Sequence, residues 1–312
     1  MHRIGGPPGG LHLLTFWKGK LLQARTDRPF IICIGAQKTG TTWLFRALGQ
    51  HPDIAAPPVK ELHYFDHVHI GNRALVRRMT DVAAQIRSEF PDLVARFKAE
   101  RTLPEDPDLA RRFTFAFGEP SDEWYLSLFP QKGMALDITP AYSALPASGY
   151  RHIGEMSSDI RLVFVLRNPF DRILSQLRYR HRPDIREYQG REKHELSNVT
   201  DEELLELARS PGVIARSDYA TTLRRVWNEI PSERVFHFFY DDLRADPVGF
   251  AQQLCGCVGL DPTLLPAPQP QRVNATAQYA FSDHVLNEVR NISEPLVEDL
   301  AQLIEIPASW RS

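Results

Sequence analysis

A continuous apolar stretch followed directly by a glycine-bounded polar loop restricts the fold of this chain more than any other feature. Residues 29–36 read PFIICIGA, an isoleucine-rich run that begins at a proline. Such a run is typical of a strand buried on both faces of a parallel sheet. Residues 41–51, TTWLFRALGQH, then place apolar side chains at helical spacing. The sequence therefore predicts a strand, a tight loop and a helix, with backbone N–H groups and the helix dipole directed at the loop.

The loop between them has the glycine spacing of the consensus G-x-x-x-x-G-K-[ST], but its lysine is displaced. Gly35 and Gly40 have the expected separation, whereas Thr41 stands where the consensus has lysine. The only lysine of the loop is Lys38. In a triphosphate site, the lysine after the second glycine reaches the β- and γ-phosphates. A lysine within the loop suits a less charged ligand, with one 5′-phosphate capped by a sulfuryl group, whose bridging oxygen it can reach.

Strand-like and helical patterns alternate over the rest of the chain. Further strands are expected within the segments 53–66, 133–143, 159–182 and 234–243. Helices are expected over much of 71–118, after the turn at Asn168-Pro169, and at 200–209, 216–229 and 247–258. This alternation predicts an α/β fold of three layers, α/β/α, with a central parallel sheet. We expect a tail at 1–28 and one domain at 29–312, with a helical insertion at about 67–130 and a charged loop at about 178–203.

Composition and charge exclude several classes of protein. The net charge of −2 argues against binding nucleic acid through bulk electrostatics. The three cysteines, Cys33, Cys255 and Cys257, do not make a disulfide framework, and no second ligand pair follows the Cys-x-Cys step to complete a metal site. No apolar run reaches the roughly 18 residues of a membrane helix, and the N-terminus lacks a signal-peptide pattern. We therefore expect a cytoplasmic location, with a membrane-surface contact by residues 11–22 left open.

A second motif, VFVLRNPFDRILSQL at 163–177, places Arg167 at a strand end and Ser175 on the following helix. Together with QKTGTTWL, it resembles the sulfotransferases that use 3′-phosphoadenosine 5′-phosphosulfate (PAPS). In that family the loop binds the 5′-phosphosulfate, and the arginine and serine bind the 3′-phosphate, which suits a bidentate cation. The resemblance covers about residues 29–310 and implies a P-loop-like fold, PAPS as cofactor with 3′-phosphoadenosine 5′-phosphate (PAP) as product, and no metal. The nucleotide-binding residues that it implies are Gln37, Lys38, Thr39, Gly40, Thr41, Thr42, Trp43, Arg167, Ser175, Tyr219, Arg272, Val273 and Asn274.

The last four of these residues come from two further stretches. RSDYATTLRRVW resembles a family helix whose tyrosine lies near the nucleotide, and Tyr219 takes that place. QPQRVNATAQY resembles a basic loop that closes over the phosphates, and its matching residues are Arg272, Val273 and Asn274. A Lys-Gly step common in some branches of the family is absent here.

The acceptor side is expected at VKELHYFD, residues 59–66. In a strand-like segment alternate side chains share a face, so Glu61 and His63 would point the same way. A carboxylate beside an imidazole can take a proton from an acceptor. The stretch resembles the E-x-H-[FY]-F-D segment of glycan and heparan-type sulfotransferases, in which the glutamate is the general base. The resemblance implies that Glu61 is the base and that His63 and Asp66 support it or bind acceptor. Lys60 is also expected to bind acceptor.

A third stretch, ALDITPAYS, bears on the identity of the base and of the acceptor. The small-molecule branch of the family has a histidine base at this place, and none occurs here, which favours Glu61 and leaves Asp137 in reserve. Tyr142 matches a family segment near the acceptor, and both Asp137 and Tyr142 are expected to contact the acceptor. Ile138 stands where glycan enzymes often have lysine, which argues against a polyanionic glycan. Four basic residues lie close together in the sequence: Arg178, Arg180, His181 and Arg182. They could bind the acceptor, or they could form the solvated end of a helix.

The predicted reaction is in-line transfer of a sulfuryl group to an acceptor hydroxyl or amine. Glu61 removes the acceptor proton, and Lys38 with the loop N–H groups stabilises the charge that develops on the leaving phosphate oxygen. Two other functions remain open, a P-loop kinase of a small metabolite and a non-catalytic nucleotide-binding protein. A glycan and a small molecule both remain open as acceptors, and the oligomeric state is not readable from the sequence.

Overall fold

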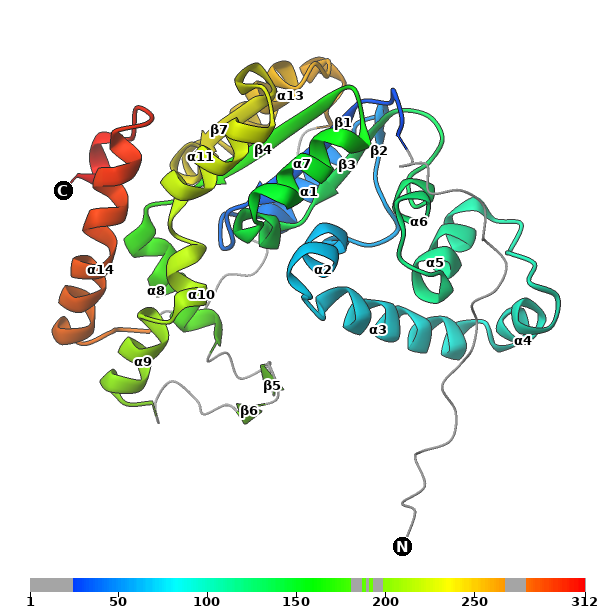
Figure 1. Ribbon diagram of the computed structural model, residues 1–312, viewed down its shortest axis with the longest axis horizontal. Coiled ribbons are helices and arrows are strands. Elements are labelled where there is room, and N and C mark those ends of the chain that lie inside the picture. The colour runs from blue at the N-terminus through cyan, green and yellow to red at the C-terminus, as the bar shows by residue number, and fades with distance from the viewer. Residues whose placement is uncertain (1–24, 181–186, 189–190, 193–198, 267–278, 312) are drawn as a thin grey trace, which may run out of the picture.

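The computed structural model describes residues 25–180, 187–188, 191–192, 199–266 and 279–311. Its centre is a sheet of five parallel strands in the order β2-β3-β1-β4-β7 (Figure 1). The strands are β1 (Phe30–Gly35), β2 (Ile54–Ala55), β3 (Met134–Ile138), β4 (Ile160–Leu166) and β7 (Val235–Phe239). The predicted α/β class and the central parallel sheet are therefore confirmed.

Strand β1 is buried on both faces, as its apolar run predicts. Phe30 and Ile32 point into one core together with α7 (Ala147–Met156) and α11 (Tyr219–Glu229). Ile31 and Cys33 point into a second core with α1 (Thr41–Leu48) and α13 (Pro247–Cys257). Helices thus cover both faces of the sheet and complete the three layers. Cys255 packs in the second core while Cys257 is exposed at the end of α13.

Two groups of helices flank the sheet on opposite sides (Figure 1). The first group runs between β2 and β3 and consists of α2 (Tyr64–Ile70), α3 (Ala74–Glu89), α4 (Pro91–Glu100), α5 (Pro107–Phe117) and α6 (Asp122–Ser127). The second group shares a separate apolar cluster and consists of α8 (Pro169–Arg180), α9 (Asp201–Ala208), α10 (Pro211–Ala215) and α14 (Asp283–Ala301). The first group lies where the helical insertion is expected. The division of the chain into a tail at 1–28 and one domain at 29–312 stays a prediction.

The remaining elements are short. They are α12 (Tyr240–Ala245), the antiparallel pair β5 (Glu187–Tyr188) and β6 (Arg191–Glu192), and 3₁₀ turns at Pro140–Ala144, Ser232–Arg234, Pro262–Leu264 and Ala308–Trp310. Most of the charged loop expected at 178–203 lies outside the described residues. No helix in the described ranges combines the length and the apolar character needed to cross a bilayer.

Two strand expectations were wrong. The segment 234–243 changes from strand to helix at Tyr240, where Asp241 and Asp242 occupy the first turn of α12 and favour a helix N-terminus. In the segment 53–66 the expected short strand forms as the two-residue β2 and ends before the Pro-Pro step, which cannot donate to a strand ladder. The strand-like path expected for Glu61 and His63 is wrong, because a turn that leads into α2 takes its place.

The strand order determines where a ligand can bind. Strand β3 lies on one side of β1 and β4 on the other, so the chain changes direction at the centre of the sheet. In open α/β sheets the crevice at such a switch point, outside the carboxyl ends of the strands, is the usual binding site. The loop after β1 and the residues after β4 both lie at this edge.

Burial of β1 on both faces predicts a large cost for shortening its side chains. Ile32→Ala should lower the free energy of unfolding by about 2–5 kcal/mol, because it leaves a cavity in a fully buried site. Urea denaturation of the purified variant measures the change. Val76→Ala on the exposed face of α3 is the matched control and should change the same quantity by less than about 0.5 kcal/mol. Equal effects of the two substitutions would contradict the arrangement.

Candidate functional site

The loop between β1 and α1 is a tight turn with two left-handed residues. Lys38 has φ 74° and Gly40 has φ 72°. A Cβ on Gly40 would come within 2.9 Å of Leu243, so glycine is required there for space as well as for backbone angle. The Thr39 hydroxyl donates to the Ala36 carbonyl over 2.7 Å and closes the turn. A non-glycine residue held in this strained conformation is typical of ligand-binding loops.

Arg167 joins this loop to the end of β4. Its Nη1 donates to the carbonyl of Lys38 over 2.9 Å, and its guanidinium carbon lies 4.9 Å from the centroid of the Tyr240 ring. The Lys38 ammonium lies 3.8 Å from the centroid of the Tyr179 ring on α8. Both contacts are cation–π interactions that hold a positive charge at the carboxyl edge of the sheet. The two nucleotide-binding motifs that the sequence predicts are therefore brought together.

Two further predicted nucleotide residues, Ser175 and Tyr219, are buried near this edge. Ser175 lies on the buried face of α8, and the Tyr219 ring packs edge-on against Phe164 of β4. Burial raises the pKa of Tyr219 to about 12, against the opposing charges of Arg172 and Arg167. The Tyr219 hydroxyl and the Nε of Arg167 are both buried without a hydrogen-bond partner. Since buried polar atoms are nearly always paired, these donors fit a site for an anionic ligand.

The other predicted nucleotide residues are divided between the loop, the start of α1 and a stretch that is not described. Gln37, Thr42 and Trp43 are partly exposed, whereas Thr41 is buried in the first turn of α1. Arg272, Val273 and Asn274 lie outside the described residues, as do His181 and Arg182. No group of three or more His, Cys, Asp or Glu side chains within the described ranges could hold a metal ion.

On the acceptor side, Glu61 is surrounded by positive groups. Arg78 of α3 donates to its Oε2 over 3.0 Å, and Lys60 pairs with its Oε1. The Nε2 of His63 lies 3.6 Å from the same Oε2. Burial acts to raise the pKa of Glu61, but the contacts with His63, Lys60 and Arg78 outweigh burial and hold that pKa well below its usual range. Glu61 is therefore a carboxylate at any physiological pH.

Glu61 and His63 face each other through an unusual backbone path. Both residues are left-handed, with φ 60° and 56°, and the intervening Leu62 is fully buried in the core. The two side chains meet as expected. They are brought together by the left-handed backbone of the two residues, and not by the alternation of side chains along a strand. His63 then serves as the N-cap residue of α2.

A second contact, at Nδ1, fixes the orientation of the His63 imidazole. Its Nδ1 lies 2.8 Å from the Oδ2 of Asp66, which also accepts from the side chain of Asn72. Burial acts to lower the pKa of His63, but the carboxylates of Asp66 and Glu61 outweigh it and raise that pKa. Asp66 has no exposed surface, so it orients the imidazole in the way that buried carboxylates orient catalytic histidines.

Asp137 and Tyr142 lie beneath this group and are also fully buried. Asp137 accepts hydrogen bonds from Thr139 over 2.7 Å and from the hydroxyls of Tyr125 and Tyr142 over 3.0 Å each. The Tyr142 hydroxyl in turn accepts from the backbone N–H of Tyr64 over 3.1 Å. Burial raises the pKa of Asp137 to about 6. These contacts give both residues a supporting position under α2, and their predicted contact with acceptor stays a prediction.

A chain of hydrogen bonds holds α2 from its opposite side. His69 near the end of α2 lies 3.0 Å from the Nδ1 of His152 and 3.3 Å from the Ser148 hydroxyl on α7. His152 reaches Asp122 over 2.9 Å, and Asp122 also accepts from the Tyr64 hydroxyl over 2.6 Å. No sequence pattern predicts this series of hydrogen bonds or the contact of Arg78 with Glu61. The residues involved come from separate helices of the insertion and of the layers on the sheet.

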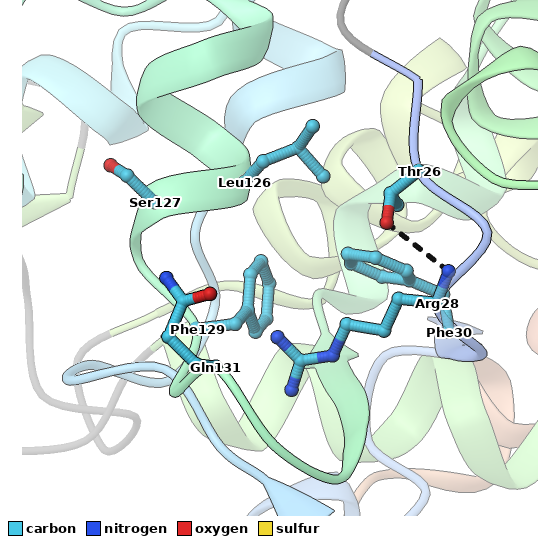
Figure 2. Close-up of a pocket in the computed structure, with 7 residues that line it drawn as sticks. All are labelled: Thr26, Arg28, Phe30, Leu126, Ser127, Phe129 and Gln131. Carbon is cyan, nitrogen blue, oxygen red and sulfur yellow. Dashed lines mark hydrogen bonds between the residues drawn. The ribbon is translucent and has the colours of Figure 1, made fainter.

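A cavity of about 370 Å³ lies elsewhere, at the amino end of β1 (Figure 2). Its lining residues are Thr26, Arg28, Phe30, Leu126, Ser127, Phe129 and Gln131. Arg28 is bound to main-chain carbonyls, with its Nε donating to Gly133 over 2.7 Å. Phe30 is the first residue of β1, so this cavity and the loop lie at opposite ends of the strand. We therefore place the functional site at the carboxyl edge and not in this cavity.

Comparison with known proteins identifies the family and the fold of the chain. A model of the sulfotransferase family matches residues 29–263. The structure resembles a sulfotransferase from Alicyclobacillus acidocaldarius, with 23% identity, a TM-score of 0.59, and coverage of 92% of this chain and 100% of that chain. It also resembles the sulfotransferase domain of the Synechococcus PCC 7002 olefin synthase, with 16% identity, a TM-score of 0.51, and coverage of 94% and 100%.

No curated protein sequence matches the chain significantly. The two solved structures share the P-loop-like fold, which confirms the fold expected from the sequence. The family match begins one residue before β1 and ends within the 3₁₀ turn at Pro262–Leu264, and so includes both motifs and the Glu61 group. The chain is therefore a member of the sulfotransferase family.

Proposed function

We propose that this sulfotransferase takes the sulfuryl group from PAPS and transfers it in line to an acceptor hydroxyl or amine. The observation that carries the proposal is the contact between Arg167 and the Lys38 carbonyl, because it joins the two predicted nucleotide motifs at one edge of the sheet. The unpartnered donors beside that contact supply further support. A glycan and a small molecule both remain candidate acceptors.

In this proposal the bound nucleotide supplies a sulfuryl group activated by its anhydride bond to the 5′-phosphate. Lys38 and the N–H groups at the start of α1 stabilise the negative charge that develops on the leaving phosphate oxygen. Arg167 and Ser175 hold the 3′-phosphate, with Tyr219 beside them. The charges already present at this edge are positive, so the protein is arranged for an anion before any ligand arrives.

Glu61 takes the proton from the acceptor. Its carboxylate is ionised and oriented by Lys60 and Arg78, so one oxygen can accept a hydrogen bond from the attacking group. His63, fixed by Asp66, lies beside that carboxylate, and its contact helps to keep the proton affinity of Glu61 low. An acceptor that reaches Glu61 would also contact Lys60 and His63. Proton removal by so weak a base is suited to a step in which the nucleophile loses its proton late, after bond formation to sulfur has begun.

The first test of the proposal concerns the donor. Calorimetric titration with PAP should show tight binding that is independent of Mg²⁺, and ATP should not bind under the same conditions. A preference for Mg-ATP would contradict the proposal and support a kinase of a small metabolite. Binding of PAP without transfer of sulfate to a broad acceptor panel would support a non-catalytic protein.

Lys38→Ala should reduce kcat by about 10²–10³-fold, because it removes a donor to charge that exists mainly in the transition state. The affinity for PAP should change much less. Steady-state kinetics with radiolabelled PAPS measures kcat, and calorimetry measures the affinity. Lys132→Ala, at an exposed position beyond the amino end of the sheet, is the control and should leave both unchanged. If Lys38→Ala lost its affinity for PAP but kept the wild-type kcat at saturating PAPS, the proposed role of Lys38 in stabilising the leaving group would be contradicted.

Glu61→Gln keeps the shape of the side chain and removes its basicity, so kcat should fall by about 10²–10⁴-fold with PAP affinity unchanged. Arg78→Met removes one of the charges that lower the pKa of Glu61, so that pKa should rise. The enzyme needs the carboxylate, and the acid limb of the kcat/KM profile should therefore move to higher pH. An acid limb of Arg78→Met that moved to lower pH would exclude Glu61 as the titrating base.

A further inference from the structure

Arg172 is a fully buried arginine for which the structure provides no carboxylate. It lies on α8, has no exposed surface, and donates from Nε to Ser217 Oγ over 2.6 Å and from Nη2 to the Val213 carbonyl over 3.0 Å. Its Nη1 is buried without a partner. Burial lowers the pKa of Arg172 to about 10, so the guanidinium remains charged at neutral pH.

The surroundings of Arg172 are positive as well. The charges of Arg216 and Arg167 act on Arg172, and each of these two arginines has a buried Nε without a hydrogen-bond partner. Across the described ranges of the chain, none of these three arginines forms an ion pair with a carboxylate. Burial of an unpaired charge is costly, and removal of a charge from water is normally offset by an opposite charge. The arrangement therefore calls for an anion.

Arg172 also connects the two segments that carry the predicted 3′-phosphate residues. It is three positions before Ser175 on α8, so the two side chains lie on one face of the helix. Its partner Ser217 is two positions before Tyr219, at the entry to α11. The hydrogen bonds of Arg172 therefore fix the position of Ser175 relative to Tyr219.

We infer that Arg172 is the buried counter-cation and positioning residue behind the subsite of Arg167 and Ser175, and that a ribose 3′-phosphate is the anion that balances it. The inference rests on the proposed function, because that function places the 3′-phosphate at this subsite. Arg172 has no exposed surface, and we assign it no direct contact with the ligand. It acts through its charge and through the hydrogen bonds to Ser217 and Val213.

The test compares two nucleotides that differ only in the 3′-phosphate. Calorimetry gives Kd for PAP and for adenosine 5′-phosphate with the wild-type chain, Arg172→Met and Arg172→Lys. Arg172→Met should weaken PAP binding on the order of tenfold, as expected for loss of a unit charge in a site of intermediate dielectric. Binding of adenosine 5′-phosphate should change by less than about twofold, and Arg172→Lys should keep most of the preference for PAP.

Three outcomes separate the possibilities. Equal weakening of both nucleotides by Arg172→Met, or no weakening of either, would overturn the inference. If Arg172→Met does not fold, Ser217→Ala decides, because it keeps the charge and removes a hydrogen bond that positions it: selective weakening of PAP binding supports the inference and an unchanged preference contradicts it. If the wild-type chain itself does not prefer PAP, the proposed 3′-phosphate site fails before Arg172 is at issue.

Discussion

The parallel pairing of β1 with β4 is the interaction on which the rest of the structure depends. It places Gly35 beside Phe164 and so brings the ends of two strands, far apart in sequence, to one edge of the sheet. The loop after β1 and Arg167 after β4 can then exchange a hydrogen bond. The apolar side chains of both strands alternate between two cores, and this burial keeps the two backbones in register. The precision of the site is thus a result of core packing.

The two halves of the site satisfy their charges in opposite ways. Glu61 contacts Lys60, Arg78 and His63, and His63 lies between two carboxylates, so the ionisable groups of the acceptor side form a closed network, although the Oδ1 of Asp66 is buried without a hydrogen-bond partner. The nucleotide side has buried arginine nitrogens and a tyrosine hydroxyl without partners. A closed network fixes geometry and protonation in advance, whereas an open one leaves its favourable interactions for the ligand. In the proposed function, the open side suits a nucleotide that carries two phosphate groups, and the closed side suits an acceptor that gives up a single proton.

The sequence predicted the sheet, the loop and the meeting of Lys38 with Arg167, because these features depend on local patterns and on the usual geometry of parallel sheets. It predicted that Glu61 and His63 would face each other, but for the wrong reason, since left-handed residues on both sides of Leu62 are not a periodic signal. The supporting contacts were beyond its reach. Arg78 meets Glu61, and His152 meets His69, only because separate helices pack together in three dimensions. Pairwise contacts of this kind leave no trace in spacing or composition.

The contact of α3 with Glu61 links parts of the molecule that have different tasks. Helix α3 belongs to the group of helices between β2 and β3, which lies outside the central sheet (Figure 1). Through Arg78 it adds to the effects of His63 and Lys60 that lower the pKa of Glu61. If Glu61 acts as the base, as we propose, a change in these helices that shifted Arg78 would also alter the pKa of that base. In the proposed mechanism, evolution of this group of helices and evolution of the catalytic chemistry are therefore coupled.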